Sequence, residues 1–367
     1  EVKNLTTLII ITLIILIAAP QMTVAQPDTL WTRTFGNPTG PDEFTSVNQT
    51  IDNGYILTGY TRDSGISESD LILIKTDSNG NEEWNQVFGS DGNWEKGNCV
   101  QLTTDGGYII VGWTENNGND IWLIKTDLNG NEEWNQTYGG GGVERANSVQ
   151  QTTDGGYIIF GNWLIKTDSN GNEEWINENI IGLDGKQTID GGYIITHSGI
   201  YNQEEWGNWS DFKLIKTDSQ GQEEWSQIYH TENMDAAAYS VQQTEDGGYI
   251  LAGYRGNMES GQMDGVLIKT DFYGIQEWEF IFDGGETNDE FRAVKQTTDG
   301  NYIITGRSIP DLLIVKVSSI GEILWSQTIG LYPQYLNGMG KSIEQTEDNG
   351  YIVAGYRDMN IEQYYTD

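Results

Sequence analysis

A single motif repeats seven times along this chain, and the repeat limits the possible fold more than any other feature. The consensus is Gln-Thr-x-Asp-Gly-Gly-Tyr-Ile-Ile-x-Gly, a spacer, and then Leu-Ile-Lys-Thr-Asp-x-x-Gly-x-x-x-Trp. The tyrosines that mark the copies are Tyr55, Tyr108, Tyr157, Tyr193, Tyr249, Tyr302 and Tyr351. A period of roughly 50 residues that contains several short strands is typical of a propeller blade. One such unit cannot bury its apolar faces alone, so the copies must stack or close on one another.

Each copy is expected to form four short strands. In the second copy these are Cys99–Leu102, Tyr108–Trp113, Ile121–Thr126 and Glu132–Tyr138, which are rich in β-branched and aromatic residues. The turns between them contain Asp-Gly-Gly or Asp-x-x-Gly, and glycine tolerates the positive φ that such turns need. The sequence therefore predicts one four-stranded antiparallel blade for each copy.

The two ends of the repeat region predict how the array closes. Pro27–Trp31 matches a fourth strand with nothing before it, and Ile361–Asp367 matches a third strand with nothing after it. Joined together, they would complete the last blade and remove an exposed sheet edge. Residues 27–367 are thus predicted to form an all-β, seven-bladed β-propeller of four-stranded antiparallel blades, closed by the N-terminal strand joining the C-terminal blade. An open solenoid is the alternative.

The repeated tryptophans should fill equivalent slots between the strands or blades of this ring. They are Trp31, Trp84, Trp134, Trp175, Trp225, Trp278 and Trp325.

Two charged positions recur on either side of the third turn in five copies. A lysine precedes the turn and a glutamate follows it, so a cross-strand ion pair is predicted. The lysines are Lys75, Lys125, Lys166, Lys216 and Lys269, and the glutamates are Glu83, Glu133, Glu174, Glu224 and Glu277. Because a catalytic site is needed only once, a pair that repeats indicates structure.

Residues 1–25 have the organisation of an export signal. Lys3 is followed by the apolar run Leu8–Ala19, and Thr23-Val24-Ala25 offers small residues for cleavage. The run is short for a membrane span, although an uncleaved anchor remains the alternative. Secretion or display at the cell surface is therefore expected.

The charge limits the classes of partner. The chain has 55 acidic and 19 basic residues and a net charge of −36. Such a charge argues against nucleic acid and anionic membrane surfaces, which attract positive proteins. It favours solubility, cations, cationic partners or neutral glycans.

Few residues are available for familiar catalytic or metal centres. Cys99 is the only cysteine, so no disulfide framework or thiolate metal site is expected. The two histidines, His197 and His230, lie far apart in the sequence. The sequence therefore gives little support for a histidine-based zinc site or a Ser-His-Asp triad.

The segment Lys-Thr-Asp-x-x-Gly-x-x-x-Trp resembles the tryptophan-docking repeat of quinoprotein-type propellers, with one residue fewer in the turn. The whole unit is similar to the Asp-Gly-Gly-Tyr and Leu-Ile-Lys-Thr-Asp repeats of many secreted bacterial and archaeal proteins, some of which are labelled endoglucanases. The resemblance covers residues 27–367 and implies a propeller. Quinoprotein dehydrogenases use adjacent cysteines, which this chain lacks, so a quinone cofactor does not follow.

Loops between the second and third strands vary, and they predict a groove. Phe160–Trp163 should form a tight hairpin in the third copy, whereas Ser198–Asp211 should form a long loop in the fourth. A low blade beside a tall one leaves a notch over blades two to four. Its predicted walls are Trp94, Trp113, Tyr201, Trp206 and Trp209. Aromatic rings with nearby carboxylates suit carbohydrate; the alternative is that these side chains only pack the loops.

Acidic residues recur just before the first strand of several copies. They are Asp42, Glu95, Glu144 and Asp289, with Asp235 offset by one place. In a ring they would approach the mouth of the central channel, where oxygen ligands could hold Ca²⁺. The alternative is that each carboxylate caps backbone N–H groups of its own inter-blade turn.

These observations predict an exported, non-catalytic binding or adhesion module that recognises glycan or protein through its variable loops. The alternative is an extracellular glycoside hydrolase or lyase, endoglucanase-like, that uses carboxylates near the channel mouth.

Overall fold

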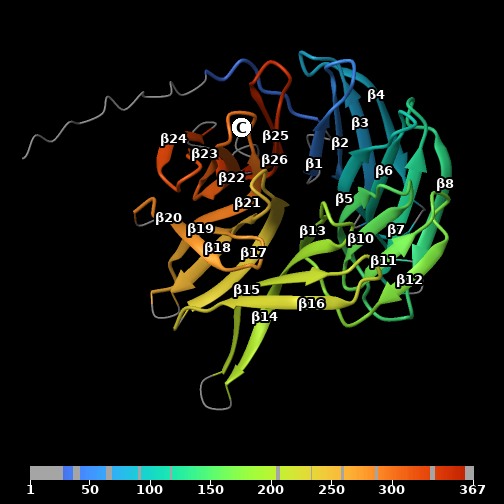
Figure 1. Cartoon of the computed structure of the whole chain (residues 1–367). Helices are drawn as coiled ribbons and strands as arrows, with labels where there is room; N and C mark the ends of the chain where they lie inside the picture. Colours follow the sequence, from blue (N-terminus) through green and yellow to red (C-terminus); the bar gives the residue numbers. More distant parts are fainter. Residues whose placement is uncertain are drawn as a thin grey trace, which may run out of the picture.

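The computed structural model describes residues 28–35, 42–62, 68–89, 92–115, 118–203, 207–232, 234–257, 260–285, 288–330 and 335–359 (Figure 1). The predicted signal peptide, residues 1–25, lies outside these ranges. Within them, no helix is long and apolar enough to cross a bilayer.

The described strands form antiparallel sheets in which each strand pairs with its neighbours in the sequence. Blades one to three are β1 (Glu43–Gln49), β2 (Tyr55–Thr61), β3 (Asp70–Thr76) and β4 (Glu82–Phe88); β5 (Glu95–Leu102), β6 (Tyr108–Thr114), β7 (Asp120–Thr126) and β8 (Glu132–Tyr138); and β9 (Ala146–Gln151), β10 (Tyr157–Gly161), β11 (Leu164–Thr167) and β12 (Glu173–Asn177). Blades four to six are β13 (Asp184–Gln187), β14 (Tyr193–Gln203), β15 (Gly207–Thr217) and β16 (Glu223–Tyr229); β17 (Met234–Gln243), β18 (Tyr249–Asn257), β19 (Met263–Thr270) and β20 (Gln276–Phe282); and β21 (Asp289–Gln296), β22 (Tyr302–Ser308), β23 (Asp311–Val317) and β24 (Ile323–Ile329). The seventh repeat contributes β25 (Tyr335–Gln345) and β26 (Tyr351–Met359).

The prediction of seven four-stranded blades is wrong. The described residues form six four-stranded blades, and the seventh repeat forms a two-stranded sheet of β25 and β26. Ile361–Asp367, predicted as its third strand, lies outside the described residues, and residues 28–35 contain no strand. In every complete blade the fourth strand pairs only with the third. A strand needs a neighbour to complete its backbone hydrogen bonds, so the repeat count overestimated the number of blades and the N-terminal segment does not close the ring as a strand.

Packing of the first strands closes the ring. Each first strand contacts the first strand of the next sheet, and β25 in turn contacts β1 (Figure 1). Seven clusters of buried apolar residues lie between the sheets, each built from two neighbouring sheets. The core is therefore divided among the junctions between sheets, as expected for a unit that cannot fold alone.

The predicted tryptophan slots are confirmed as contacts between consecutive repeats. Each tryptophan packs against the tyrosine of the next repeat, with ring centroids 5.8–6.1 Å apart. Trp31, in the coil 28–35, makes the same contact with Tyr55. In blade two, Gly130 lies so close to Trp84 that an added Cβ would fall 2.5 Å from the indole ring.

A glutamine at the end of the first strand links six of the seven described sheets to the preceding one. In blade three, the side-chain oxygen of Gln151 accepts a hydrogen bond from the backbone N–H of Thr104 in blade two, at 2.9 Å. The glutamines that make this contact are Gln49, Gln151, Gln187, Gln243, Gln296 and Gln345. Gln49 bonds to Glu347 N of the seventh repeat at 2.9 Å, so the same link joins the two ends of the ring. Blade two has Leu102 at this position.

Gly130→Ala should destabilise the protein more than Gly106→Ala. Both glycines have positive φ, 77° and 89°, so both substitutions should cost about 1–2 kcal/mol of backbone strain. Only Gly130 faces the Trp84 ring, whereas nothing lies within 4 Å of a Cβ at Gly106. The clash should add about 1–3 kcal/mol for Gly130→Ala, measured by chemical denaturation. Equal losses would show that the close approach to Trp84 is unimportant.

Gln151→Leu should lower the free energy of unfolding by about 1 kcal/mol, because Thr104 N loses its acceptor. The substitution copies the natural Leu102 of blade two, so the fold should be retained. Gln101→Leu changes a first-strand amide that makes none of these links and is the matched control, with an expected change within about 0.5 kcal/mol. A control that loses as much stability as Gln151→Leu would contradict the linking role.

Candidate functional site

The ring has two faces with different content. The Asp-Gly-Gly turns and the Asp-x-x-Gly turns lie at one end of every blade, which we call the turn face. The connections between second and third strands, and those between blades, lie at the opposite end, which we call the loop face. Antiparallel order within each sheet fixes this division.

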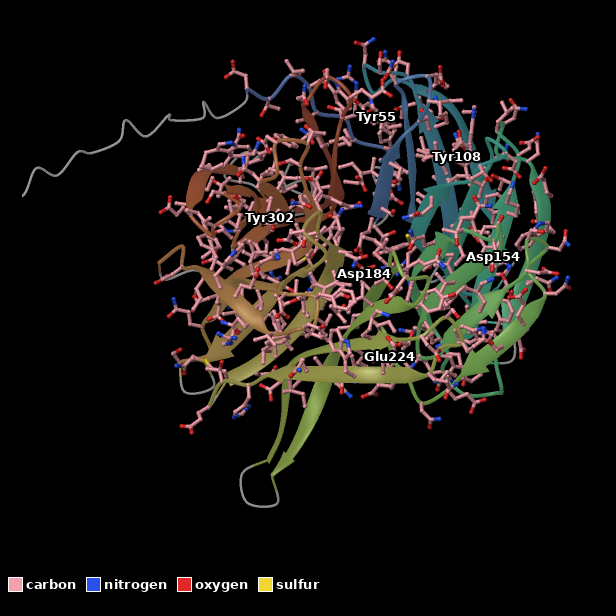
Figure 2. All side chains as sticks on the ribbon, in the orientation of Figure 1. Tyr55, Tyr108, Asp154, Asp184, Glu224 and Tyr302 are labelled. Carbon is pink, nitrogen blue, oxygen red and sulfur yellow. The ribbon has the colours of Figure 1, made fainter. Side chains whose placement is uncertain are left out.

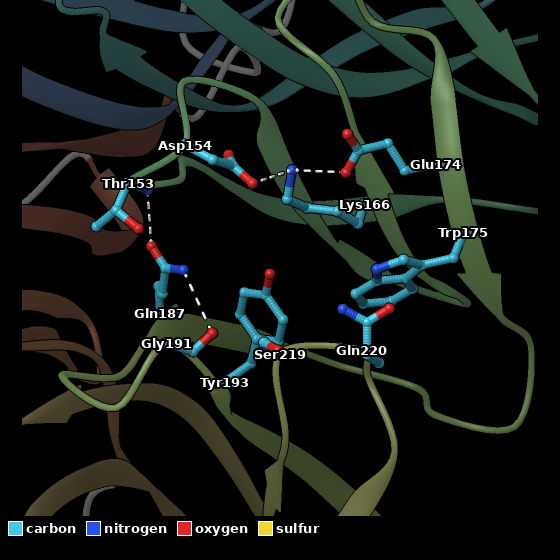
Figure 3. A pocket seen from close by; sticks show the side chains of 10 residues that line it. All are labelled: Thr153, Asp154, Lys166, Glu174, Trp175, Gln187, Gly191, Tyr193, Ser219 and Gln220. Carbon is cyan, nitrogen blue, oxygen red and sulfur yellow. Dashed lines mark hydrogen bonds and ion pairs between the residues drawn. The ribbon is translucent and has the colours of Figure 1, made fainter.

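On the turn face, a cavity of about 670 Å³ opens between blades three and four (Figure 3). Lys166 Nζ lies 3.0 Å from both Asp154 Oδ2 and Glu174 Oε2 and donates to the Thr167 carbonyl at 2.8 Å. The rings of Trp175 and Tyr193 line the same cavity, 6.0 Å apart.

This arrangement repeats, which assigns the cavity to structure. The five predicted Lys–Glu pairs are confirmed at 2.8–3.0 Å. Each lysine is almost fully buried and also pairs with the aspartate of the first turn in its own blade. Those aspartates are Asp52, Asp105, Asp154, Asp190 and Asp246.

The aspartate was not predicted as a partner of the lysine, because its hydrogen bonds within the first turn already accounted for its presence in the motif. Asp154 in fact does both: Oδ1 accepts from Gly156 N and Thr152 Oγ1, while Oδ2 faces Lys166. In blade six Leu324 replaces the glutamate, and Lys316 there bonds to the Tyr351 hydroxyl at 3.0 Å.

Hydrogen bonds within the turns, together with the lysines, lower the pKa of these turn aspartates. Burial acts to raise the pKa of Asp105, but hydrogen bonds from the Thr103 hydroxyl, the turn backbone and Lys125 outweigh it and lower the pKa to about 2. The pKa of Asp52 is also lowered to about 2, because bonds from Lys75 and Thr50 outweigh its burial.

A second cavity, of about 740 Å³, lies where the first strands of blades two to six end on the turn face. Threonine and glutamine side chains line most of it, together with Lys186. Several of these amides already link neighbouring sheets, as Gln187 and Gln243 do. The cavity therefore shares its polar groups with the framework.

On the loop face, two of the five predicted groove residues have described side chains. The Arg62 guanidinium lies 4.8 Å from the Trp94 ring centroid, and the Arg145 guanidinium lies 4.4 Å from that of Trp113. Both rings thus make cation–π contacts. Trp206 lies outside the described residues.

Tyr201 and Trp209 face each other in the register of β14 and β15, and the structure describes only their backbone. The groove that these five aromatic residues would form stays a prediction.

The heights of blades three and four differ as predicted, but for a different reason. The tight hairpin of blade three is confirmed, with Gly161 N donating to Trp163 O at 3.1 Å. The long loop predicted at Ser198–Asp211 is wrong, because β14 and β15 stay paired as far as Gln203 and Gly207. Figure 1 shows this hairpin projecting beyond the other blades. Aromatic and β-branched residues such as Ile200 and Tyr201 favour strands.

Of the acidic residues predicted to hold Ca²⁺, only Glu144 and Asp289 cap N–H groups of their own inter-blade turns. Backbone N–H groups donate to Asp42 at 3.1 Å, to Glu144 at 3.4 Å and to Asp289 at 2.7 Å. Glu95 accepts from the Thr114 hydroxyl at 3.1 Å, and Asp235 accepts from Ser210 N at 3.1 Å. The described part of the chain contains no group of three or more His, Cys, Asp or Glu placed to hold a metal ion. Calcium binding stays a prediction without support from these contacts.

Sequence reasoning missed a charged cluster at the axis of the ring, near the loop face. Glu43 of blade one lies 3.5 Å from Lys96 of blade two and 3.3 Å from Lys341 of the β25–β26 sheet. In blade six, Glu290 pairs with Arg292 and Arg307. We call these six residues the axial cluster.

Tyrosine rings lie beside its cations. Tyr239 lies 3.8 Å from the Arg292 guanidinium, and Tyr60 and Tyr356 lie 4.8 and 5.4 Å from Lys96 and Lys341. Little in the sequence indicates this cluster. Its members come from different repeats, and most occupy positions that hold another residue type in other copies.

Further along the axis, Asp184 pairs with Lys186 at 2.9 Å and Lys295 pairs with Glu344 at 2.6 Å. Figure 2 shows Asp184 nearer the middle of the ring than Asp154 and Glu224. Together with the axial cluster, these pairs bring six cations together with four carboxylates around the axis. Glu95, Asp235 and Asp289 also lie on first strands, so the charge around the axis is close to balanced although the net charge of the chain is −36.

No protein-family model matches the chain, and neither does any curated protein. Solved structures do resemble it. The WD40 domain of Neurospora crassa Pan2 is 11% identical, with 87% of this chain and 88% of that one covered and a TM-score of 0.58. The structure described as YCF48 bound to D1 peptide is 11% identical, with coverages of 89% and 96% and a TM-score of 0.54. A periplasmic gluconolactonase of Pseudomonas aeruginosa is 11% identical, with coverages of 78% and 85% and a TM-score of 0.55.

The chain is a β-propeller. At such low identity the likeness shows the fold alone, and a peptide-bound protein and a gluconolactonase are both among the similar structures. The resemblance noted in the sequence is thus confirmed for the propeller fold, while the secreted repeat family stays a prediction.

Acid should destabilise this propeller as its turn aspartates become protonated. Their folded-state pKa values lie below the ordinary value of about 3.9, so their stabilisation is present above about pH 5 and is lost as the pH falls toward about 2. Asp105→Asn keeps an oxygen acceptor but removes the charge. Denaturation at several pH values should show lower stability than wild type near pH 7 and a smaller loss in acid. Identical pH dependence in both proteins would contradict this role.

Proposed function

We propose that this propeller is a non-catalytic binding module that recognises a partner protein through its loop face. The observation that carries the proposal is the asymmetry between the two faces. The turn face repeats the same contacts from blade to blade, whereas the loop face carries the protruding β14–β15 hairpin and the axial cluster. Varied loops on a rigid scaffold are where binding residues are usually found.

The turn face is occupied by contacts that hold the sheets together. Buried lysines pair with two carboxylates each in five blades, and glutamines link six of the junctions. A ligand there would compete with contacts on which the ring depends. On the loop face, the described contacts between blades, such as Arg62 with Trp94, differ from one junction to the next.

The β14–β15 hairpin is suited to contact a protein. Its strands have 11 residues each, compared with four or five in β10 and β11 of the neighbouring blade. A paired strand beyond the body of a domain offers backbone and side-chain groups on both faces, which protein partners often use. The similar YCF48 structure was solved with a peptide, which supports peptide or protein recognition as a use of this fold.

Export to the cell surface or the medium is part of the proposal, on the strength of the apolar run Leu8–Ala19 and the small residues that follow it. A hydrolase or lyase is not favoured. Among the described residues, Glu43 and Glu290 near the axis each lie beside two cations, so both carboxylates are already paired within the fold.

Shortening the hairpin tests the proposal. Residues 201–209 can be replaced by Asn-Gly, because Ile200 and Ser210 are directly paired and a two-residue turn would connect them. The variant should keep the melting temperature of wild type. The variant and wild type are each immobilised on a support and exposed to extracts of the source organism. The variant should bind any protein that wild type captures about ten-fold more weakly, which is a loss of about 1.4 kcal/mol in binding free energy.

Ile189→Ser, which changes an 84% exposed residue on the turn face, is the control and should capture as wild type does. Capture that survives removal of the hairpin would count against the proposal. So would a hairpin-dependent signal on a glycan array without a protein partner, because that result would assign the face to carbohydrate.

A further inference from the structure

We propose that the β25–β26 sheet binds an extended segment of another protein, which adds a strand along β26 and pairs a lysine with Asp348. This binding place is separate from the loop face, and the inference does not depend on the proposed function. It rests on the edge of β26, on the position of the N-terminal coil, and on a turn aspartate that has no cation beside it in the described part of the chain.

Along β26, the described residues provide a partner strand on one side only. β26 pairs with β25 over Tyr351–Met359, whereas the second strand of every complete blade pairs with both its first and its third strand. In those blades, the tyrosine that opens the second strand and the two residues after it are buried. In β26 the same three residues, Tyr351, Ile352 and Val353, are only partly buried. The outer edge of β26 thus has backbone groups that an added strand can pair with.

The N-terminal coil lies where the fourth strand of this sheet would lie. Trp31 packs against the tyrosine of blade one, as fourth-strand tryptophans do at the other junctions. Phe35 packs against Phe44 of β1 with ring centroids 5.9 Å apart, and the corresponding phenylalanines of β20 and β21 are 6.1 Å apart. On the side of blade six, Gln327 donates to Thr29 Oγ1 at 3.4 Å. The coil therefore runs from blade six to blade one past the β25–β26 sheet (Figure 1).

A third strand would lie between β26 and this coil, and the described residues contain none there. In a complete blade, the residues before the third-strand lysine are apolar and buried, as Leu73 and Ile74 are before Lys75. They alternate between two clusters: Ile74 packs in the cluster shared with the β25–β26 sheet, and Leu73 packs in the cluster shared with blade two. A strand added to β26 should therefore carry apolar residues on both faces, followed by a lysine.

The first turn of the seventh repeat contains an aspartate, Asp348, that indicates a lysine in the added strand. In all six complete blades, the aspartate at this position pairs with the third-strand lysine at 2.6–3.0 Å. Asp348 Oδ1 accepts from Thr346 Oγ1 at 2.5 Å and from Gly350 N at 3.0 Å. These two bonds lower the pKa of Asp348, and no lysine or arginine of the described residues contributes to the shift. The carboxylate is therefore ionised near neutral pH and can attract a cation.

Charge favours a basic segment of another protein in this place. Residues 361–367 of the same chain contain neither lysine nor arginine, so they cannot supply the cation that the other six aspartates have. The net charge of −36 also attracts cationic partners. In strand addition the backbone hydrogen bonds provide affinity and the side chains provide specificity. Here the pairing of a lysine with Asp348 would provide the specificity.

Fluorescence anisotropy on the full chain tests the inference with a labelled peptide that copies β3, Asp70–Thr76, followed by a soluble Gly-Ser tail. A second peptide has glutamine in place of the lysine. Wild type should bind the lysine peptide about ten-fold more tightly than the glutamine peptide, as expected for one charge-assisted bond. Asp348→Asn should bind the two peptides equally, because the charged partner of the lysine is gone.

Two controls separate strand addition from general attraction between charges. Glu347→Gln makes the same change of charge at the neighbouring exposed residue and should keep the preference for the lysine peptide. A peptide with Leu73→Pro keeps its lysine but cannot pair as a strand, so it should not bind wild type. Melting temperatures show whether each variant is folded.

Equal binding of the lysine and glutamine peptides to wild type, or no binding of either, would overturn the inference. So would a preference for lysine that Asp348→Asn leaves intact. Binding only by a variant that lacks residues 361–367 would assign the place to the chain's own end, and a dimer that the peptide dissociates would assign it to a second copy; either result would also overturn the inference. The capture experiment with the shortened hairpin tests the loop face alone, so its outcome is independent of these results.

Discussion

The ring depends on the contact between the tryptophan of one repeat and the tyrosine of the next. It occurs at all seven junctions, including the one where Trp31 comes from a coil and not from a strand. Each pair contributes about 0.5–1.5 kcal/mol beyond its buried area. Because the indole also packs under a turn of the next blade, as Trp84 does under Gly130, the contact fixes the turn as well as the tyrosine. Sheets that would be unstable alone are held against their neighbours by this contact.

Because the junctions depend on repeated contacts, the turn face and the loop face differ in how freely their residues can vary. The turn face must keep its lysine, aspartate and glutamate in nearly every blade, since each buried ammonium group needs both carboxylates. Blade six shows how narrow the tolerance is: the loss of the glutamate at Leu324 is accompanied by a new bond from Lys316 to Tyr351. Among the described residues, the contacts on the loop face differ from junction to junction, so the length of a hairpin such as β14–β15 can change without breaking a contact that all junctions share.

The sequence predicted what the repeat encodes and failed where the repeat is broken. The fold class, the tryptophan slots, the Lys–Glu pairs and the tight hairpin at Gly161 all follow from motifs that recur or from short loops. The strand content of Ser198–Asp211 was misjudged because its length was taken as irregularity, although its residues favour strands. The number of blades was overestimated because a motif copy does not guarantee four hydrogen-bonded strands. The axial cluster was invisible because only the ring brings Glu43, Lys96 and Lys341 together.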